Sequence, residues 1–186
     1  MKAWALSQRP QVLKTSGKLV ELITPYLKPQ ARLVVSISHD DYSKHTGGVQ
    51  LSIRREAEAF ESNGDCYLNI HPTQPLPTIA DVGDGLRLTL VCNGRRLGGA
   101  TALEVVEALR QLGVQAQSNL FIVHSLHGHA PEIVGALAKA TTFQQAFYWI
   151  HDFLAVCAGY NLLRNGVTYC GAPPAGSAAC TVCVYG

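Results

Sequence analysis

The stretch Phe147-Tyr148-Trp149-Ile150-His151-Asp152-Phe153 joins a short apolar run to an abrupt polar end. Four large apolar residues in a row are too few for a helix and are typical of a buried strand. His151 and Asp152 follow the run at once. Because the ligands of open α/β sheets bind beyond the carboxyl ends of the strands, this pair is a candidate for chemistry.

Strand and helix patterns alternate along the rest of the chain. Short apolar, partly β-branched runs predict strands at residues 32–38, 66–70, 86–92 and 120–123. Helical periodicity predicts helices over 12–27, from 49 to a stop at Asn63-Gly64, from a capping box at 101–104 to about 112, and over 131–140. Asn93-Gly94 is interpreted as a turn. The alternation predicts an α/β fold with a Rossmann-like, doubly wound and mostly parallel sheet.

The expected organisation has a single folded domain with two flanking segments. Residues 1–30 are interpreted as an N-terminal helical extension and residues 31–156 as the Rossmann-like domain. Residues 157–186 are interpreted as a Cys-rich loop segment, because they are rich in Gly, Pro and Cys.

Composition excludes several classes of protein. The 186 residues carry a net charge of +2 without a Lys/Arg cluster, which argues against a nucleic-acid partner. There is neither a run of about 18 apolar residues nor an N-terminal apolar core of signal-peptide length, so we expect no transmembrane segment and a cytoplasmic location, with peripheral membrane association left open. In that compartment six cysteines are more often thiols or metal ligands than disulfides.

Thr46-Gly47-Gly48 stands between a predicted strand and a predicted helix. Paired glycines let the backbone approach a ligand, and the free N–H groups of a helix start favour anions. The motif therefore indicates a phosphate site, and the alternative is an ordinary tight loop. It is not the dinucleotide fingerprint, since no G-x-G-x-x-G occurs.

Histidines are concentrated at two predicted strand ends. His124, His127 and His129 follow the strand at 120–123, where they either line a cleft and hydrogen-bond the backbone or, less commonly, bind a metal. His151 and Asp152 are interpreted as a base or as a phosphate or hydroxyl partner. The alternative is a capping Asp beside a buried, satisfied His.

Four cysteines occur near the C-terminal end, at Cys157, Cys170, Cys180 and Cys183. They fit a structural zinc site, which would supply the folding energy that a Gly/Pro-rich segment lacks. Reduced thiols and, in an oxidising compartment, disulfides are the alternatives. Cys66 and Cys92 lie inside predicted strands and are expected to be buried apolar residues.

Three of these motifs, in this order, resemble the N-terminal half of a GT-B glycosyltransferase of the large retaining family four. They are His45-Thr46-Gly47-Gly48-Val49-Gln50, the histidine loop from His124 to Pro131, and Trp149-Ile150-His151-Asp152-Phe153 followed by Cys157 to Leu163 and Cys170. Together they span residues 32 to 183. Ala158 departs from the family phrase, which usually has Pro there.

The resemblance implies an acceptor-side domain of an enzyme that uses a nucleotide-sugar donor and a glycan or lipid-linked acceptor, in the synthesis of a bacterial surface glycan. It implies that the amides of Gly47 and Gly48 face phosphates, that His151 approaches the transferred sugar, and that catalysis needs no cofactor. The family's donor-binding C-terminal domain is not in this sequence, so an isolated half is expected to be inactive. The alternatives are a non-catalytic module that binds a glycan or a protein, and a small nucleotide- or phosphate-binding enzyme.

Overall fold

The computed structural model describes residues 12–83, 86–116, 118–154, 156–157, 159–174 and 177–183. The chain forms two compact units. The boundary between them along the sequence falls between Trp149 and Ile150, whereas the predicted boundary was after residue 156. Helix α2 (Ser16–Ile23) belongs to the first unit, since Leu19 and Ile23 are fully buried in its core. The part of segment 1–30 that the structure describes is therefore built into the domain and is not an extension of it.

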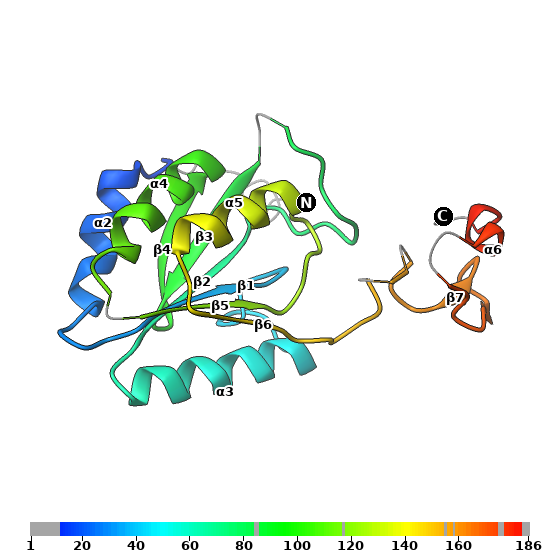
Figure 1. Ribbon diagram of the computed structural model, residues 1–186, viewed down its shortest axis with the longest axis horizontal. Coiled ribbons are helices and arrows are strands. Elements are labelled where there is room, and N and C mark those ends of the chain that lie inside the picture. The colour runs from blue at the N-terminus through cyan, green and yellow to red at the C-terminus, as the bar shows by residue number, and fades with distance from the viewer. Residues whose placement is uncertain are drawn as a thin grey trace, which may run out of the picture. The chain divides into compact units, whose positions relative to one another are not determined.

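A six-stranded sheet with the order β4-β3-β2-β1-β5-β6 forms the centre of the first unit (Figure 1). Neighbouring strands are parallel from β2 through β1 and β5 to β6, and β3 and β4 are antiparallel to their neighbours. The prediction of a mixed α/β fold with a mostly parallel sheet is confirmed. The strands are β1 (Leu33–Ile37), β2 (Cys66–Pro72), β3 (Arg87–Cys92), β4 (Arg95–Thr101), β5 (Asn119–Val123) and β6 (Gln145–Tyr148).

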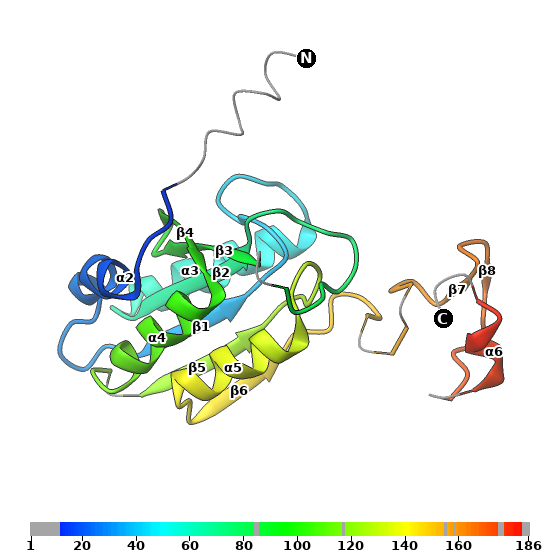
Figure 2. The ribbon, with the colours of Figure 1, turned by 90° about the horizontal axis from the view of Figure 1, so that it is seen from above.

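Helices cover both faces of this sheet (Figures 1 and 2). Helix α3 (Gly48–Ser62) packs on one face, where Ile53 and Ala57 meet Val34. Helices α2, α4 (Ala102–Gly113) and α5 (Pro131–Thr141) pack on the other, and the short 3-10 helix η1 (Thr24–Tyr26) follows α2. Because side chains alternate along a strand, Leu33, Val35 and Ile37 of β1 enter this second core.

Strand β4 was absent from the sequence prediction. The predicted Asn93-Gly94 turn is present, with φ values of 44° and 72°, and it closes a hairpin between β3 and β4. The sequence of β4, Arg95-Arg96-Leu97-Gly98-Gly99-Ala100-Thr101, contains two glycines and two arginines, so its intrinsic strand propensity is low. Pairing with β3, which the turn enforces, makes it a strand.

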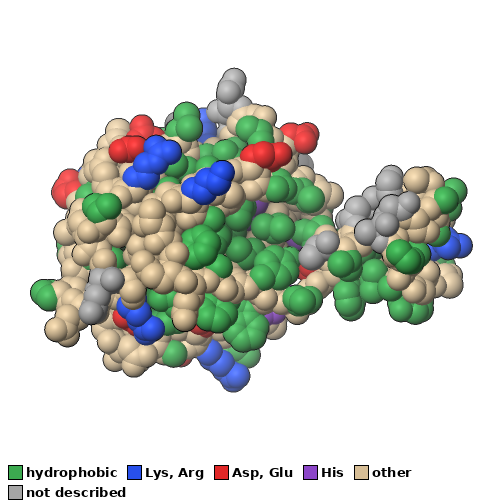
Figure 3. Space-filling view, viewed as in Figure 1, with side chains coloured by type: hydrophobic (Ala, Val, Ile, Leu, Met, Phe, Trp, Pro, Cys, Tyr) green, Lys and Arg blue, Asp and Glu red, His purple; other side chains and the backbone are tan. Residues whose placement is uncertain are grey.

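The prediction of a buried strand at residues 147–150 was wrong. Strand β6 ends at Tyr148 and lies at the edge of the sheet, where it pairs with β5 alone. All four of its residues are exposed, and apolar side chains are visible at the surface near β6 (Figure 3). An apolar run records strand propensity but does not distinguish a central strand from an edge strand.

Helix α4 begins at the predicted capping box, but only half of the box forms. Thr101 Oγ1 accepts a hydrogen bond from the Glu104 backbone N–H at 3.3 Å. The Glu104 carboxylate instead accepts from the Ser16 N–H at 2.5 Å and so connects α4 to the start of α2.

We expect Thr101→Ala to lower the free energy of unfolding by about 1 kcal/mol, because an N-terminal N–H of α4 loses its acceptor. Urea titration measures the change. Thr101→Ser retains the hydroxyl and is expected to stay close to the wild type. An equal loss in both variants would mean that the threonine methyl group, rather than the cap, stabilises α4.

The second unit, from Ile150 onward, has little regular structure. It contains the two-stranded sheet of β7 (Leu163–Arg164) and β8 (Thr168–Tyr169) and the short helix α6 (Ala178–Thr181). Asn165 and Gly166 connect the two strands with φ values of 51° and 74°. Ser177 caps α6 through the Ala179 N–H. The described residues of the predicted loop segment 157–186 thus include a short hairpin and one turn of helix.

Candidate functional site

The strand order defines a switch point between β1 and β5. From β1 the chain crosses through α3 to β2 on one side, and β5, which follows α4, pairs on the other side of β1. In open α/β sheets a crevice forms at such a point, beyond the carboxyl ends of the strands. Residues 38–47 follow β1 there and residues 124–130 follow β5.

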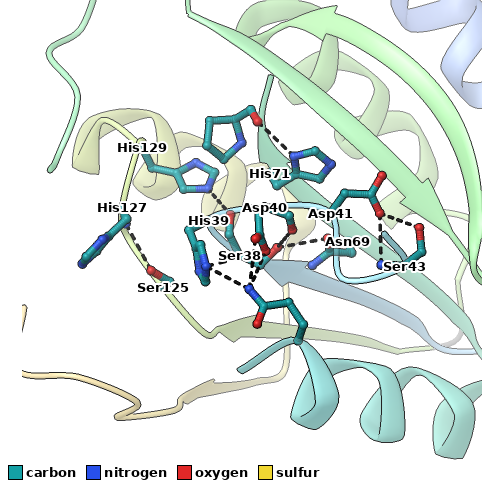
Figure 4. A network of polar contacts seen from close by, with 12 residues as sticks. Ser38, His39, Asp40, Asp41, Ser43, Asn69, His71, Ser125, His127 and His129 are labelled. Carbon is teal, nitrogen blue, oxygen red and sulfur yellow. Dashed lines mark hydrogen bonds and ion pairs between the residues drawn. The ribbon is translucent and has the colours of Figure 1, made fainter. Parts of the chain in front are cut away.

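His39 and Asp40 occupy this edge directly after β1. The Gln50 side-chain amide, which is almost fully buried, donates to both Asp40 carboxylate oxygens, at 2.9 and 3.0 Å, and lies 3.0 Å from His39 Nε2 (Figure 4). The ring of His127, from the loop after β5, lies 6.3 Å from the ring of His39. Both imidazoles are half-buried at the switch point.

A buried polar layer supports these residues. His129 is fully buried, and its Nε2–H donates to the Ser38 carbonyl at 2.7 Å. Ser38 in turn donates through its hydroxyl to Asn69 Oδ1 of β2 at 3.1 Å. His71, at the end of β2, donates from Nδ1 to the Pro72 carbonyl at 2.9 Å (Figure 4). Burial lowers the pKa of His129 to about 4 and also lowers that of His71, so both rings are neutral at neutral pH.

Glu56 of α3 connects three elements beneath the edge. Its carboxylate accepts from His124 Nε2 at 3.0 Å and from Trp149 Nε1 at 3.0 Å, and lies 2.9 Å from the Tyr67 hydroxyl. Burial opposes ionisation, but hydrogen bonds from His124, Tyr67 and Trp149 outweigh it and leave the pKa of Glu56 below its usual value. Burial and the nearby Glu56 charge raise the pKa of Tyr67.

Gly47 and Gly48 form the start of α3, next to the His39 cluster. Gly47 is the N-cap, and no side chain caps the first turn. A Cβ at Gly47 would lie 2.3 Å from Gln50 Oε1, so the absence of a side chain lets Gln50 fold back toward Asp40. The predicted phosphate loop of Thr46, Gly47 and Gly48 is thus brought to the switch point, and its role in binding stays a prediction.

The three histidines after β5 have different surroundings. His124 bonds Glu56 and stacks near Trp149, with ring centroids 6.5 Å apart. His129 bonds the backbone, and the ring of His127 lies near that of His39. Within the described ranges no group of three or more His, Cys, Asp or Glu side chains is placed to hold a metal ion. His129 thus bonds the backbone whereas His124 bonds a carboxylate, and the role of the three histidines in binding stays a prediction.

The second unit contains the other predicted site residues. Asp152 Oδ1 accepts from the Leu154 N–H at 2.9 Å within a turn rather than at a helix start, and His151 is half-buried, so both interpretations of this pair stay predictions. Cys157, Cys170, Cys180 and Cys183 are also half-buried, and zinc binding by them stays a prediction. Cys66 and Cys92 are fully buried in the first unit, as expected, with Sγ atoms 3.6 Å apart.

Sequence reasoning missed four residues of the site, which are His39, Asp40, Gln50 and Glu56. The signal for His39-Asp40 was available, because this pair follows a predicted strand just as His151-Asp152 does. Gln50 and Glu56 had no such signal, since a polar residue on a helix is usually exposed.

Comparison of the chain with protein-family models, with curated proteins and with solved structures finds no match. Among the helices of the described residues, none combines the length and the apolar character needed to cross a membrane.

Proposed function

We propose that this chain forms the acceptor-side half of a GT-B retaining glycosyltransferase that uses a nucleotide-sugar donor. The observation that supports the proposal most is the switch point itself, where the start of α3, which no side chain caps, lies next to the cluster of His39, Gln50 and His127. Phosphate binding at a helix start and hydroxyl binding by neutral or charged imidazoles are the interactions that such a reaction needs.

The chemistry follows from what sugar transfer must stabilise. A departing diphosphate carries negative charge, which the N–H groups of Gly47 and Gly48 and the dipole of α3 would favour. The Gln50 amide donates to His39 Nε2, which leaves the Nδ1–H of the neutral, half-buried imidazole to donate a hydrogen bond to a sugar hydroxyl oxygen. By the family resemblance, His151 positions or polarises the transferred sugar. The donor would be held by a second domain that faces this edge.

The test is nucleotide-sugar turnover by this chain combined with a donor-binding domain, in one polypeptide or added in trans. We expect His151→Ala and His39→Ala each to reduce turnover by about 100-fold or more, in the range that general acid–base groups contribute. Glu58→Ala, at an exposed position on α3, is the control and should retain activity. Unchanged turnover in both histidine variants would contradict the proposal.

A non-catalytic module that binds a protein or a glycan is the second candidate. The observation in its favour is the second unit, where the apolar side chains of Val167, Tyr169 and Val182 are 65% to 80% exposed. If this candidate is correct, the chain binds its partner with an affinity that His39→Ala and His151→Ala do not change, and Tyr169→Ala weakens binding.

A further inference from the structure

A cavity of about 290 Å³ lies where β2 ends and β3 begins. The strands supply Pro72 and Arg87, and the loop after β5 supplies Gly128. The connection between β2 and β3 supplies Thr73, Gln74, Leu76 and Leu86. The volume is at the lower limit of the roughly 300–1,000 Å³ that is typical of small-molecule sites. The cavity therefore suits one compact ligand rather than an extended chain.

The backbone fixes one wall of this cavity. The Gly128 N–H donates to the Thr78 carbonyl at 2.7 Å, and the Ala80 N–H donates to the His129 carbonyl at 3.0 Å. Gly128 has a φ of 73°, and a Cβ on it would lie 2.7 Å from Pro72 Cγ. The close approach of the two loops thus requires glycine, both for its conformation and for its lack of a side chain.

The lining combines one charge with polar and apolar side chains. Of the described residues that form it, Arg87 carries the charge, Thr73 and Gln74 are polar, and Pro72, Leu76 and Leu86 supply apolar contacts. The adjacent His71 and His129 add no positive charge at neutral pH, because burial lowers the pKa of each. A guanidinium matches the paired oxygens of a carboxylate or a phosphate.

We propose that this cavity binds a compact ligand that carries a carboxylate or a phosphate group, with the oxyanion on Arg87 and the body of the ligand against Leu76 and Leu86. The site is separate from the start of α3 and does not depend on sugar transfer. It would be present whether the chain acts as an enzyme or as a binding module.

Calorimetric titration of the whole chain with inorganic phosphate, glucuronate and glucose tests the proposal. We expect one or both anions to bind and glucose not to bind, and the preferred anion identifies the oxyanion. Arg87→Gln should weaken binding about tenfold or more, whereas Arg95→Gln, a matched change of an exposed arginine on β4, should leave it unchanged. Equal anion binding by the Arg87 and Arg95 variants would contradict the proposed site. So would the absence of anion binding to the wild type at millimolar concentrations.

A second variant separates the cavity from a surface ion on Arg87. Leu76 is 45% exposed, so Leu76→Trp can fill the cavity without disturbing the core. We expect this variant to keep the melting temperature of the wild type and to lose binding of the anion that the wild type prefers. Retained binding of that anion would show that the ligand lies outside the cavity and would contradict the proposal.

Discussion

Lowering the pH from about 6.5 to about 4 is expected to cost the folded chain about 3 kcal/mol of stability through His129 alone. In the folded state this ring is fully buried, its Nε2–H donates to the Ser38 carbonyl, and its pKa is lowered to about 4 from an ordinary value of 6.5. Between these two values the unfolded chain binds a proton that the folded chain does not bind. The contribution of the neutral His129 ring to the free energy of unfolding is therefore fully present above pH 6.5 and is lost as the pH falls toward 4.

Urea titrations at several pH values between 4 and 7 measure this loss. His129→Gln keeps a polar side chain without a titrating ring. This variant should have a lower free energy of unfolding at pH 7, and that free energy should change less with pH across this range. The lowered pKa of His71 acts in the same direction, so some slope should remain. His45→Gln replaces an exposed histidine and is expected to keep the wild-type slope. If His129→Gln keeps the full slope, His129 is not the group responsible.

Glu56→Ala is expected to lower the free energy of unfolding by about 3 kcal/mol or more. The substitution removes the common acceptor of His124, Tyr67 and Trp149, and the first two of these side chains are buried. Removing the shared acceptor is costly, because the buried donors His124 and Tyr67 then have neither their hydrogen-bond partner nor water to bond to. Chemical denaturation measures the change.

Glu58→Ala is the matched control, since Glu58 lies on the exposed face of the same helix and its loss should cost less than about 0.5 kcal/mol. Glu56→Gln retains an acceptor oxygen and should fall between the two alanine variants. A loss in Glu56→Ala no larger than that in Glu58→Ala would mean that the Glu56 carboxylate does not stabilise the packing of α3 on the sheet.

Local patterns predicted the elements whose signals are contained in a few adjacent residues. The β-branched run at residues 33–37 became β1, and the Asn63-Gly64 stop ended α3, with Gly64 at a φ of 84°. The start of α4 followed from Thr101, and Pro131 opened α5. Each of these signals acts through backbone dihedrals or through a hydrogen bond between near neighbours, so it needs no knowledge of the rest of the fold.

By itself the sequence determined the α/β alternation, the helix start at Gly47-Gly48 and the histidines at the strand ends, because strand propensity, caps and turns are local properties. The tertiary structure alone decided that β6 is an exposed edge strand, that β4 pairs with β3, and that His39, Gln50 and His127 meet at one switch point. These outcomes depend on strand order and on contacts between residues far apart in the chain. A half-buried carboxylate such as Glu56 has the same sequence signature as an exposed one, and only its hydrogen bonds with His124 and Tyr67 give it a structural role.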